Sequence, residues 1–415
     1  MGWSACTEAA QLMRVLFPLH GYVKWNGGLD LVRLLVSALS HRSVSARVDL
    51  NLAMPEPSTT GRMFQFALRH VRGALAGNPD LKSGNTSALM RIAAEIARHQ
   101  NVVTCSDDAN GIADAARISH ADVVFPTMLP LGAIALHRIG YLFDFQHRYM
   151  PQLFSTRTRR NRDRSFARIA ADCDGLVVNS RAVARDVTQW LGVPPDRVLG
   201  MPFAPYAMPW SFDVTPADAQ RLHQITGKYL LISNHFWKHK DHVTAFRAFA
   251  ALRANPAYAD VQLVLTGDPI DHRDPRYYRR LVALTDELHI AASIHFLGLI
   301  PKREQLALLR GSAALIQPTL FEGSPGGGSV YEAIGLGVPA VVSDIPMNRE
   351  IDCGNVVFFR AGDPFDLVQK IAQTLAAPAE RPSRKVLLVA GDTNLADLGN
   401  TIADFLDRIL LAARS

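Results

Sequence analysis

The sequence predicts an α/β protein of two Rossmann-like, doubly wound domains that face a cleft. The chain has 415 residues, which is too long for one ordinary core and suits two domains of about 200 residues each. Short apolar runs alternate with amphipathic helical segments, as in parallel sheets with crossover helices. The stretch MPFAPYAMPWSFDVTP, which starts at Met201, holds four prolines and no helical period. It therefore indicates a linker between the two domains.

In the first half, the apolar runs predict strands and the amphipathic segments predict helices. The expected strands are Arg14–Pro18, Ala46–Leu50, Asn101–Thr104, Asp122–Phe125, Ile139–Phe143 and Gly175–Asn179. The expected helices include Leu29–Ser40, Thr86–Arg98 and Ser180–Leu191. These elements belong to a first domain over residues 1–210.

After the linker the same alternation starts again and predicts a second domain over residues 211–390. Its expected strands are Tyr229–Ile232, Val261–Thr266, Ile294–Leu297, Ala313–Gln317, Ala340–Ser343 and Val356–Phe359. Its expected helices are Val243–Ala254, Pro275–His289, Arg303–Leu309 and Pro364–Ala376. A terminal helix is expected in residues 391–415, near Leu395–Ala412, with packing back on the first domain as an open option.

Composition and charge narrow the class of protein. The formal charge of +6 permits anionic partners without identifying one. No run of eighteen apolar residues occurs, so no membrane-spanning helix is expected. Single, scattered cysteines and a start without a secretion signal indicate a cytoplasmic protein, with peripheral attachment at the inner face of the cell membrane left open. The cysteines are Cys6, Cys105, Cys173 and Cys353.

A glycine-rich loop is the most informative stretch, QPTLFEGSPGGGSVYEAIGLGVPAVVSD over Gln317–Asp344. A strand ends, glycines follow, and a short helix is expected to begin near Ser329. Glycines let backbone N–H groups approach a ligand closely, and the helix start adds a positive dipole end. The loop therefore favours a diphosphate or a polyhydroxylated ring. Its spacing fits neither a dinucleotide fingerprint nor an ATP loop. The glycines are Gly323, Gly326, Gly327 and Gly328.

Two glutamates flank this loop. A carboxylate accepts two hydrogen bonds at once, so Glu322 and Glu332 are suited to a vicinal diol of a ribose or hexose. Each also has a simpler interpretation. Ser329 and Glu332 have the spacing of a capping box, which needs no ligand. Glu322, beside a glycine, has the ordinary pattern of a solvated loop residue.

A basic turn follows the strand in YLLISNHFWKHKDHVTAF, Tyr229–Phe246. Lys240, just ahead of the expected helix, is suited to hold the charge of a phosphate. The alternative is a solvated basic turn. We expect no metal and no cofactor, because no paired carboxylate or cysteine accompanies the histidines. The basic residues of the turn are His235, Lys238, His239, Lys240 and His242.

These two stretches together resemble the donor half of the retaining family 4 glycosyltransferases with the GT-B fold. The likeness extends over roughly residues 225–376. It includes VQLVLTGDP, IHFLGLIPKREQLALLRGSAALIQPTLFEG and GVPAVVSDIPMNREI. Residues 1–210 would then be the acceptor-side domain and residues 211–390 the nucleotide-sugar donor domain.

The resemblance implies a role for each matching residue. Lys240 would act on the donor diphosphate, Glu322 near the transferred sugar, and Glu332 on the ribose hydroxyls. Gly326, Gly327, Gly328 and Ser329 would form the donor loop, and Leu299 and Ile300 would cradle the base. This sequence departs from the family pattern twice. Nine residues separate the glutamates, where the family has seven, and His235 stands where the family usually has arginine.

The first domain offers fewer assignments. Gly27 and Gly28 resemble the family's glycine loop near the phosphates, although a tight turn would explain them as well. His147, in GYLFDFQHRYMPQLFS, follows a strand that also delivers Asp144. A lone histidine there is more often structural, but the resemblance favours His147 as a cleft residue that touches sugar or acceptor.

Six arginines crowd the segment RTRRNRDRSFAR. A solvated helix face is the plain interpretation. The alternative is contact with an anionic membrane or a lipid-diphosphate acceptor. Nucleic acid is not expected, because aromatic residues are not interleaved with the arginines. The arginines are Arg157, Arg159, Arg160, Arg162, Arg164 and Arg168.

The expected function is therefore transfer of a hexose, mannose-like or related, from a nucleotide diphosphate-sugar to a glycan or lipid-linked saccharide hydroxyl. The resemblance implies retention at the anomeric carbon and a place in surface polysaccharide or lipopolysaccharide synthesis. Two alternatives stay open. One is a nucleotide-sugar 2-epimerase of the same architecture, and the other is a sugar-nucleotide-binding protein without catalysis.

Overall fold

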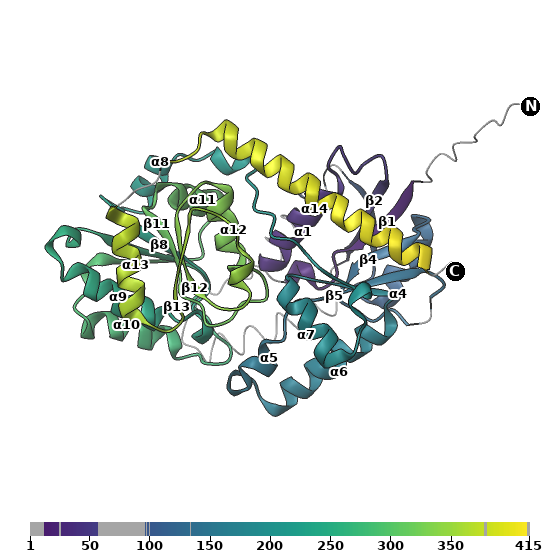
Figure 1. The fold of residues 1–415 in the computed structure, drawn as a ribbon. Helices are drawn as coiled ribbons and strands as arrows, with labels where there is room; N and C mark the ends of the chain where they lie inside the picture. The colour runs from purple at the N-terminus through teal and green to yellow at the C-terminus, as the bar shows by residue number, and fades with distance from the viewer. Residues whose placement is uncertain are drawn as a thin grey trace, which may run out of the picture.

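Two parallel α/β domains lie side by side (Figure 1). The computed structural model describes residues 12–24, 26–56, 96, 98, 100–132, 134–376 and 380–412. The expected helix Thr86–Arg98 lies almost wholly outside these described residues. The two sheets and their helices confirm the predicted fold class of two Rossmann-like units.

The first sheet has the strand order β3-β2-β1-β4-β5-β6-β7, and every pair is parallel. Its strands are mostly apolar and buried, as expected when helices cover both faces. The last strand, β7, was missed because its three residues are too few to show a pattern. The strands are β1 Met13–Pro18, β2 Val48–Pro55, β3 Asn101–Cys105, β4 Val123–Thr127, β5 His137–Leu142, β6 Gly175–Val178 and β7 Val198–Gly200.

The second sheet has the order β10-β9-β8-β11-β12-β13, again with parallel pairs throughout. The order reverses between β8 and β11, which are neighbours in the middle of the sheet. Ligands of open α/β sheets bind beyond the carboxyl ends of the strands at such a switch point. The strands are β8 Tyr229–Ser233, β9 Gln262–Thr266, β10 Ile294–Gly298, β11 Ala314–Gln317, β12 Ala340–Asp344 and β13 Val356–Arg360.

Helices follow the strands in both domains and complete the layers. In the first domain they are α1 Asn26–Leu39, α4 Ala109–Ile118, α5 Gln146–Tyr149, α6 Thr156–Asp172 and α7 Arg181–Leu191. In the second they are α8 Pro216–Leu222, α9 His242–Arg253, α10 Tyr277–Glu287, α11 Lys302–Gly311, α12 Gly327–Gly335 and α13 Pro364–Ala376. The arginine-rich segment forms α6, which begins after Ser155, whose hydroxyl accepts a hydrogen bond from the Thr158 N–H.

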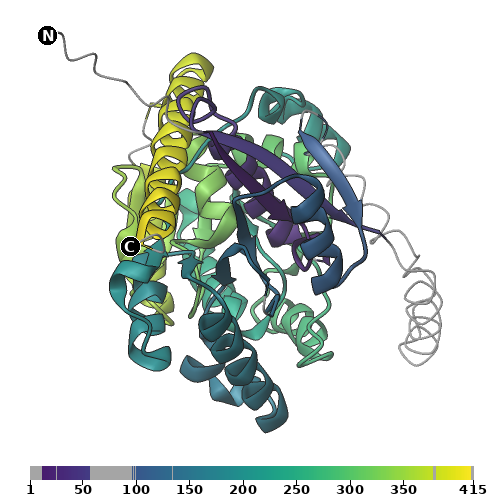
Figure 2. The same ribbon diagram turned by 90° about the vertical axis from the view of Figure 1, so that its right-hand side faces the viewer.

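The terminal helix, α14 (Arg384–Ala412), is longer than expected and crosses from the second domain to the first. Its later turns bury Leu398, Ile402 and Leu406 in the core of the first domain. Gly399 permits close packing on α1, because a β-carbon there would lie 2.2 Å from the Ala38 carbonyl oxygen. Figure 2, turned by 90°, again shows α14 lying along the first domain. None of the helices in the described part of the chain is both long and apolar enough to cross a membrane.

Candidate active site between the domains

The basic turn and the glycine loop meet at the carboxyl ends of the two central strands. The turn follows β8 and the loop follows β11, and these strands are paired. The backbone N–H of Leu320 donates to the His239 carbonyl oxygen at 2.8 Å, which joins the two loops directly. One ligand can therefore touch both loops.

Lys240 and Glu322 form an ion pair at this junction. Each residue is only 9% exposed, so the alternatives of a solvated turn and a solvated loop residue are wrong for these two. The side-chain amide of Gln317 holds the arrangement by donating to Glu322 Oε1 at 3.2 Å and to the Gly326 carbonyl oxygen at 2.8 Å. A buried ammonium and a buried carboxylate need such partners, because burial of an unpaired charge is costly.

The glycines of the loop have distinct structural roles. Gly326 has φ of +67°, and a β-carbon there would lie 2.3 Å from Val330. Gly327 also has φ of +67°, and its β-carbon would lie 3.2 Å from the Glu322 carboxyl group. Gly328 is exposed, with nothing within 4 Å of the β-carbon position. The loop thus leaves the backbone of the first turn of α12 open at Gly328, where its N–H groups have no partners within the helix.

The capping-box interpretation of Ser329 and Glu332 is wrong. Helix α12 begins at Gly327, its N-cap residue is Gly326, and no side chain caps it. Ser329 therefore lies inside the first turn, where it is buried. Glu332 instead directs its carboxylate sideways to α11.

Glu332 is held by two side chains of α11. Its Oε1 accepts from the Lys302 ammonium, and its Oε2 accepts from the Gln305 amide at 2.8 Å. Lys302 also donates to Asp30 Oδ2 of α1 at 3.2 Å, so the cluster joins both domains. Burial raises the pKa of Glu332, while Lys302 opposes that shift. Burial alone would lower the pKa of Lys302, but the carboxylates of Asp30 and Glu332 raise it well above its ordinary value, so the ammonium stays charged.

His235 is a neutral hydrogen-bond donor in this structure. Its Nδ1 accepts the backbone N–H of Asp268 at 3.0 Å, so the ring proton of the neutral imidazole is on Nε2. Burial lowers the pKa of His235, against the opposing charge of Asp268. The side chain can thus donate one hydrogen bond to a phosphate, but it does not supply the charge of the arginine that the family usually has there.

The remaining predicted donor residues lie at strand ends or helix starts. Leu299 follows β10 and is exposed, while Ile300 packs against the core of the second domain. Gly27 and Gly28 are in the first turn of α1, with Gly27 exposed and Gly28 buried. They therefore start a helix and do not form a separate tight turn.

His147 is enclosed in this structure. Its side chain has 0% exposure, and its Nε2 lies 3.1 Å from Asp163 Oδ1. The ring packs beside Phe145, Phe154 and Phe166. Contact between His147 and a sugar would require this aromatic shell to move, so its predicted role stays a prediction.

Asp144, from the same strand end, lies against the glycine loop. A β-carbon on Gly323 would lie 2.5 Å from the Phe143 carbonyl oxygen and 2.9 Å from Asp144 Cβ, so only glycine fits this contact between domains. The Ser180 hydroxyl donates to the Gly323 carbonyl oxygen at 3.1 Å. The first domain therefore packs directly on the glycine loop.

Two residues of this site were missed from the sequence. Asp30 and Lys302 both fall within stretches that resemble the family, yet they are 272 positions apart. Only the arrangement of the two domains brings them together. The one available signal was the position of Asp30, two residues beyond the Gly27-Gly28 pair.

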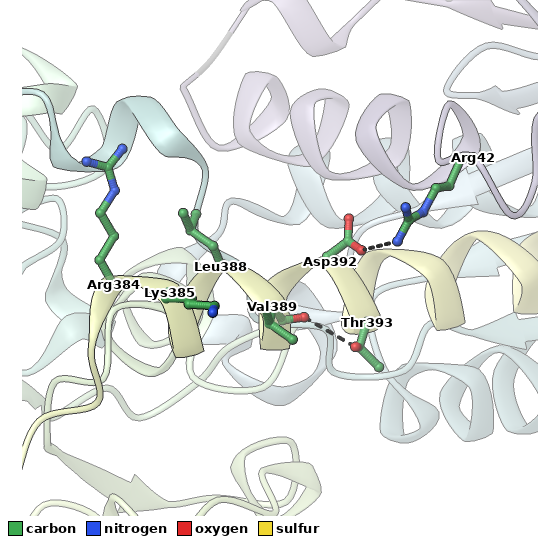
Figure 3. Close-up of a pocket in the computed structure, with 7 residues that line it drawn as sticks. All are labelled: Arg42, Arg384, Lys385, Leu388, Val389, Asp392 and Thr393. Carbon is green, nitrogen blue, oxygen red and sulfur yellow. Dashed lines mark hydrogen bonds and ion pairs between the residues drawn. The ribbon is translucent and has the colours of Figure 1, made fainter.

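No cluster of metal-binding side chains occurs among the described residues. A hollow along the first turns of α14 contains none of the predicted site residues (Figure 3). There Asp392 is paired with Arg42, and the Thr393 hydroxyl donates to the Val389 carbonyl oxygen at 3.2 Å.

Comparison with known proteins links this geometry to a family. Residues 215–386 match the family model described as glycosyl transferases group 1. No curated protein matches the chain in sequence. Among solved structures, Alr3699/HepE of Anabaena, in complex with UDP and glucose, aligns with a TM-score of 0.62 and 15% identity over 95% of this chain and 100% of that chain.

Two other solved structures share the fold. A glycosyltransferase from Rickettsia africae aligns with a TM-score of 0.64 and 11% identity over 96% of this chain and 99% of that chain. WaaG, a glycosyltransferase involved in lipopolysaccharide biosynthesis, aligns with a TM-score of 0.52 and 14% identity over 93% of this chain and 95% of that chain. The second domain therefore matches the glycosyl transferases group 1, and the whole chain shares the two-domain GT-B fold of these solved structures.

Proposed function

We propose that the protein transfers a hexose from a nucleoside diphosphate-sugar to a hydroxyl of a glycan or lipid-linked saccharide, in surface polysaccharide or lipopolysaccharide synthesis. The buried Lys240–Glu322 pair beside the open first turn of α12 is the observation that supports it most. A fixed positive charge and free backbone N–H groups are what a departing diphosphate needs. Related folds have been crystallised with UDP and UDP-glucose, so a UDP-hexose is the first donor to test.

In the proposed reaction, the acceptor hydroxyl oxygen forms a bond to the anomeric carbon of the sugar. The bond from that carbon to the β-phosphate oxygen breaks, and the hydroxyl proton leaves with the nucleoside diphosphate. Lys240 would stabilise the charge that develops on the phosphate, and His235 would add one hydrogen bond from Nε2. Glu322 would hold the sugar, and enclosure between the domains would keep water from it. Retention at the anomeric carbon follows from the family resemblance.

The other predicted residues complete the proposed donor site. Glu332 would accept hydroxyls of the ribose, since a carboxylate has lone pairs beyond those used by Lys302 and Gln305. Leu299 and Ile300 would lie along the base. Gly27 and Gly28, at the start of α1, would approach the phosphates from the first domain.

The exposed face of α6 supports peripheral contact with an anionic membrane. Four of its arginines are exposed, and their spacing puts them on one side of the helix. Anionic lipid headgroups attract such a row of charges. Arg162 differs, because it turns toward Asp144 and packs over Phe143 and Phe154. The exposed arginines are Arg157, Arg160, Arg164 and Arg168.

One set of incubations tests the proposed function and its alternatives. Donor sugars are incubated with the protein, with and without a saccharide acceptor extract, and products are followed by NMR. A transferase releases nucleoside diphosphate and forms a glycoside only when acceptor is present. An isomerised sugar from donor alone would establish the 2-epimerase instead. Binding without turnover in any mixture would leave a sugar-nucleotide-binding protein.

A further inference from the structure

Lys302 occupies an unusual place beside the proposed ribose carboxylate. It is the first residue of α11, two positions beyond Ile300, and its ammonium contacts Glu332 of the second domain and Asp30 of the first. Among the described residues, no other side chain is ion-paired both to a proposed donor-binding residue and to the opposite domain. Glu332 and the start of α1 are therefore linked through one side chain.

Neighbouring side chains hold the cluster of Lys302, Glu332 and Asp30 in place. Gln305 donates to Glu332 Oε2 at 2.8 Å and to the Ser233 hydroxyl at 2.7 Å, which ties Glu332 to the end of β8. Asp30 also accepts from Arg33 at 2.8 Å, and the Arg33 guanidinium lies 5.7 Å from the Trp210 ring of the linker. The two oxygens of Glu332 are thus oriented before any ligand arrives, and the orientation depends on Lys302.

We propose that Lys302 is a positioning residue that holds Glu332 for the donor ribose and, through Asp30, couples donor binding to the contact between the domains. This inference rests on the proposed function, because it takes Glu332 as the ribose carboxylate. A ligand that needs Glu332 in this orientation should bind better when Lys302 contacts both Glu332 and Asp30. Binding of that ligand should in turn favour the arrangement of the domains in which both contacts form.

Calorimetric titration with a nucleoside diphosphate and its 2′-deoxy analogue tests the inference. The probe is whichever of UDP, GDP and ADP binds the wild-type protein. Wild type should prefer the ribonucleotide by about tenfold, the usual effect of one hydrogen bond to a charged group. In Lys302→Met, affinity for the ribonucleotide should fall about tenfold, and the preference should shrink to about twofold.

Three further variants separate positioning from loss of structure. Lys302→Arg keeps the charge and should restore most of the preference. Asp30→Asn should weaken binding of both nucleotides and keep the preference, since Glu332 retains Lys302 and Gln305. Lys385→Met, an exposed lysine of α14, is the control and should match wild type.

The outcomes distinguish this inference from the proposed function. If no nucleoside diphosphate binds wild type, the proposed function fails. If one binds but wild type does not discriminate against the 2′-deoxy form, or if Lys302→Met behaves as wild type, only the positioning role is overturned. Wild-type affinities in Asp30→Asn would overturn the coupling between domains.

Discussion

Lys240 and Glu322 form an ion pair that differs from an ordinary surface pair because it is buried. On a surface such a pair contributes little, because water screens both charges. Here both side chains are largely enclosed, and Gln317 orients the carboxylate. A diphosphate that arrives beside Lys240 can share a charge that is already positioned, which saves the cost of reorganisation during the reaction.

Replacement of Lys240 tests this role at the level of one residue. Lys240→Ala should lower the turnover of donor by about two to three orders of magnitude, since it removes a charge that stabilises the leaving group. Lys238→Ala, in the same turn but exposed, is the matched control and should keep wild-type turnover. The turnover of both variants is measured with the same donor and acceptor and compared with that of wild type. Wild-type rates in a folded Lys240→Ala protein would remove the leaving-group assignment.

The buried imidazole of His242 should make the stability of the folded protein depend on pH. Burial, with the charge of Lys240, lowers its pKa to about 3 from an ordinary 6.5, and the ring stacks on Phe236 at 4.8 Å. Between these values the unfolded chain binds a proton that the folded protein does not. The stabilising effect of neutral His242 is therefore complete above the unfolded pKa and is lost as pH falls below it.

Unfolding by denaturant at pH 7.5 and pH 5.0 measures this effect. From pH 7.5 to pH 5.0, the free energy of unfolding of wild type should fall by about 2 kcal/mol more than that of His242→Leu. His272→Leu, an exposed histidine, should follow wild type. Equal pH dependence in wild type and His242→Leu would show that His242 is not neutral in the folded protein.

Among the structural elements, the glycine loop before α12 contains glycines whose substitution should have different effects on stability. Gly326→Ala places a side chain at φ of +67° and against Val330, so we expect a loss of at least about 1 kcal/mol in stability. Gly328→Ala meets no neighbour within 4 Å and should stabilise α12 by up to about 1 kcal/mol.

Donor affinity separates these two effects. Gly328→Ala should keep or raise the unfolding temperature and yet weaken the binding of nucleoside diphosphate, because its methyl group enters the space beside the first turn of α12. Thermal unfolding with and without nucleotide measures both quantities. A Gly328→Ala protein with full affinity would exclude close approach of the phosphates at that position.

The elements also show what a sequence can and cannot predict here. Runs such as Tyr229–Ser233 were predictable because their apolar residues form continuous buried strands. Lys240 and Glu322 could be expected to meet, since each follows a central strand. The contact between Lys302 and Asp30 could not, because it depends on the packing of one domain on the other. The start of α12 was misplaced because glycine dihedral angles, not a capping side chain, determine it.

At the scale of the whole molecule, contacts at helix starts hold the domains together. Glu350 of the second domain accepts from the backbone N–H groups of Arg181 at 2.9 Å and Ala182 at 2.7 Å, at the start of α7. A carboxylate is favoured there by the helix dipole and by the unpaired N–H groups. Separation of the two domains would break these two hydrogen bonds.

Glu350→Ala should therefore loosen the closed arrangement. We expect a loss of about 1–3 kcal/mol in stability and a larger radius of gyration by X-ray scattering. Glu287→Ala, an exposed glutamate of α10, is the control and should leave both quantities unchanged. An unchanged radius of gyration and unfolding temperature in Glu350→Ala would show that this contact does not hold the domains.

The proposed function requires that the nucleoside diphosphate-sugar binds where the basic turn and the glycine loop meet. A crystal structure of the protein with UDP tests it most directly. We expect the diphosphate beside Lys240 and the first turn of α12, with the ribose at Glu332. A nucleotide bound elsewhere, for example in the hollow along α14 (Figure 3), would contradict it.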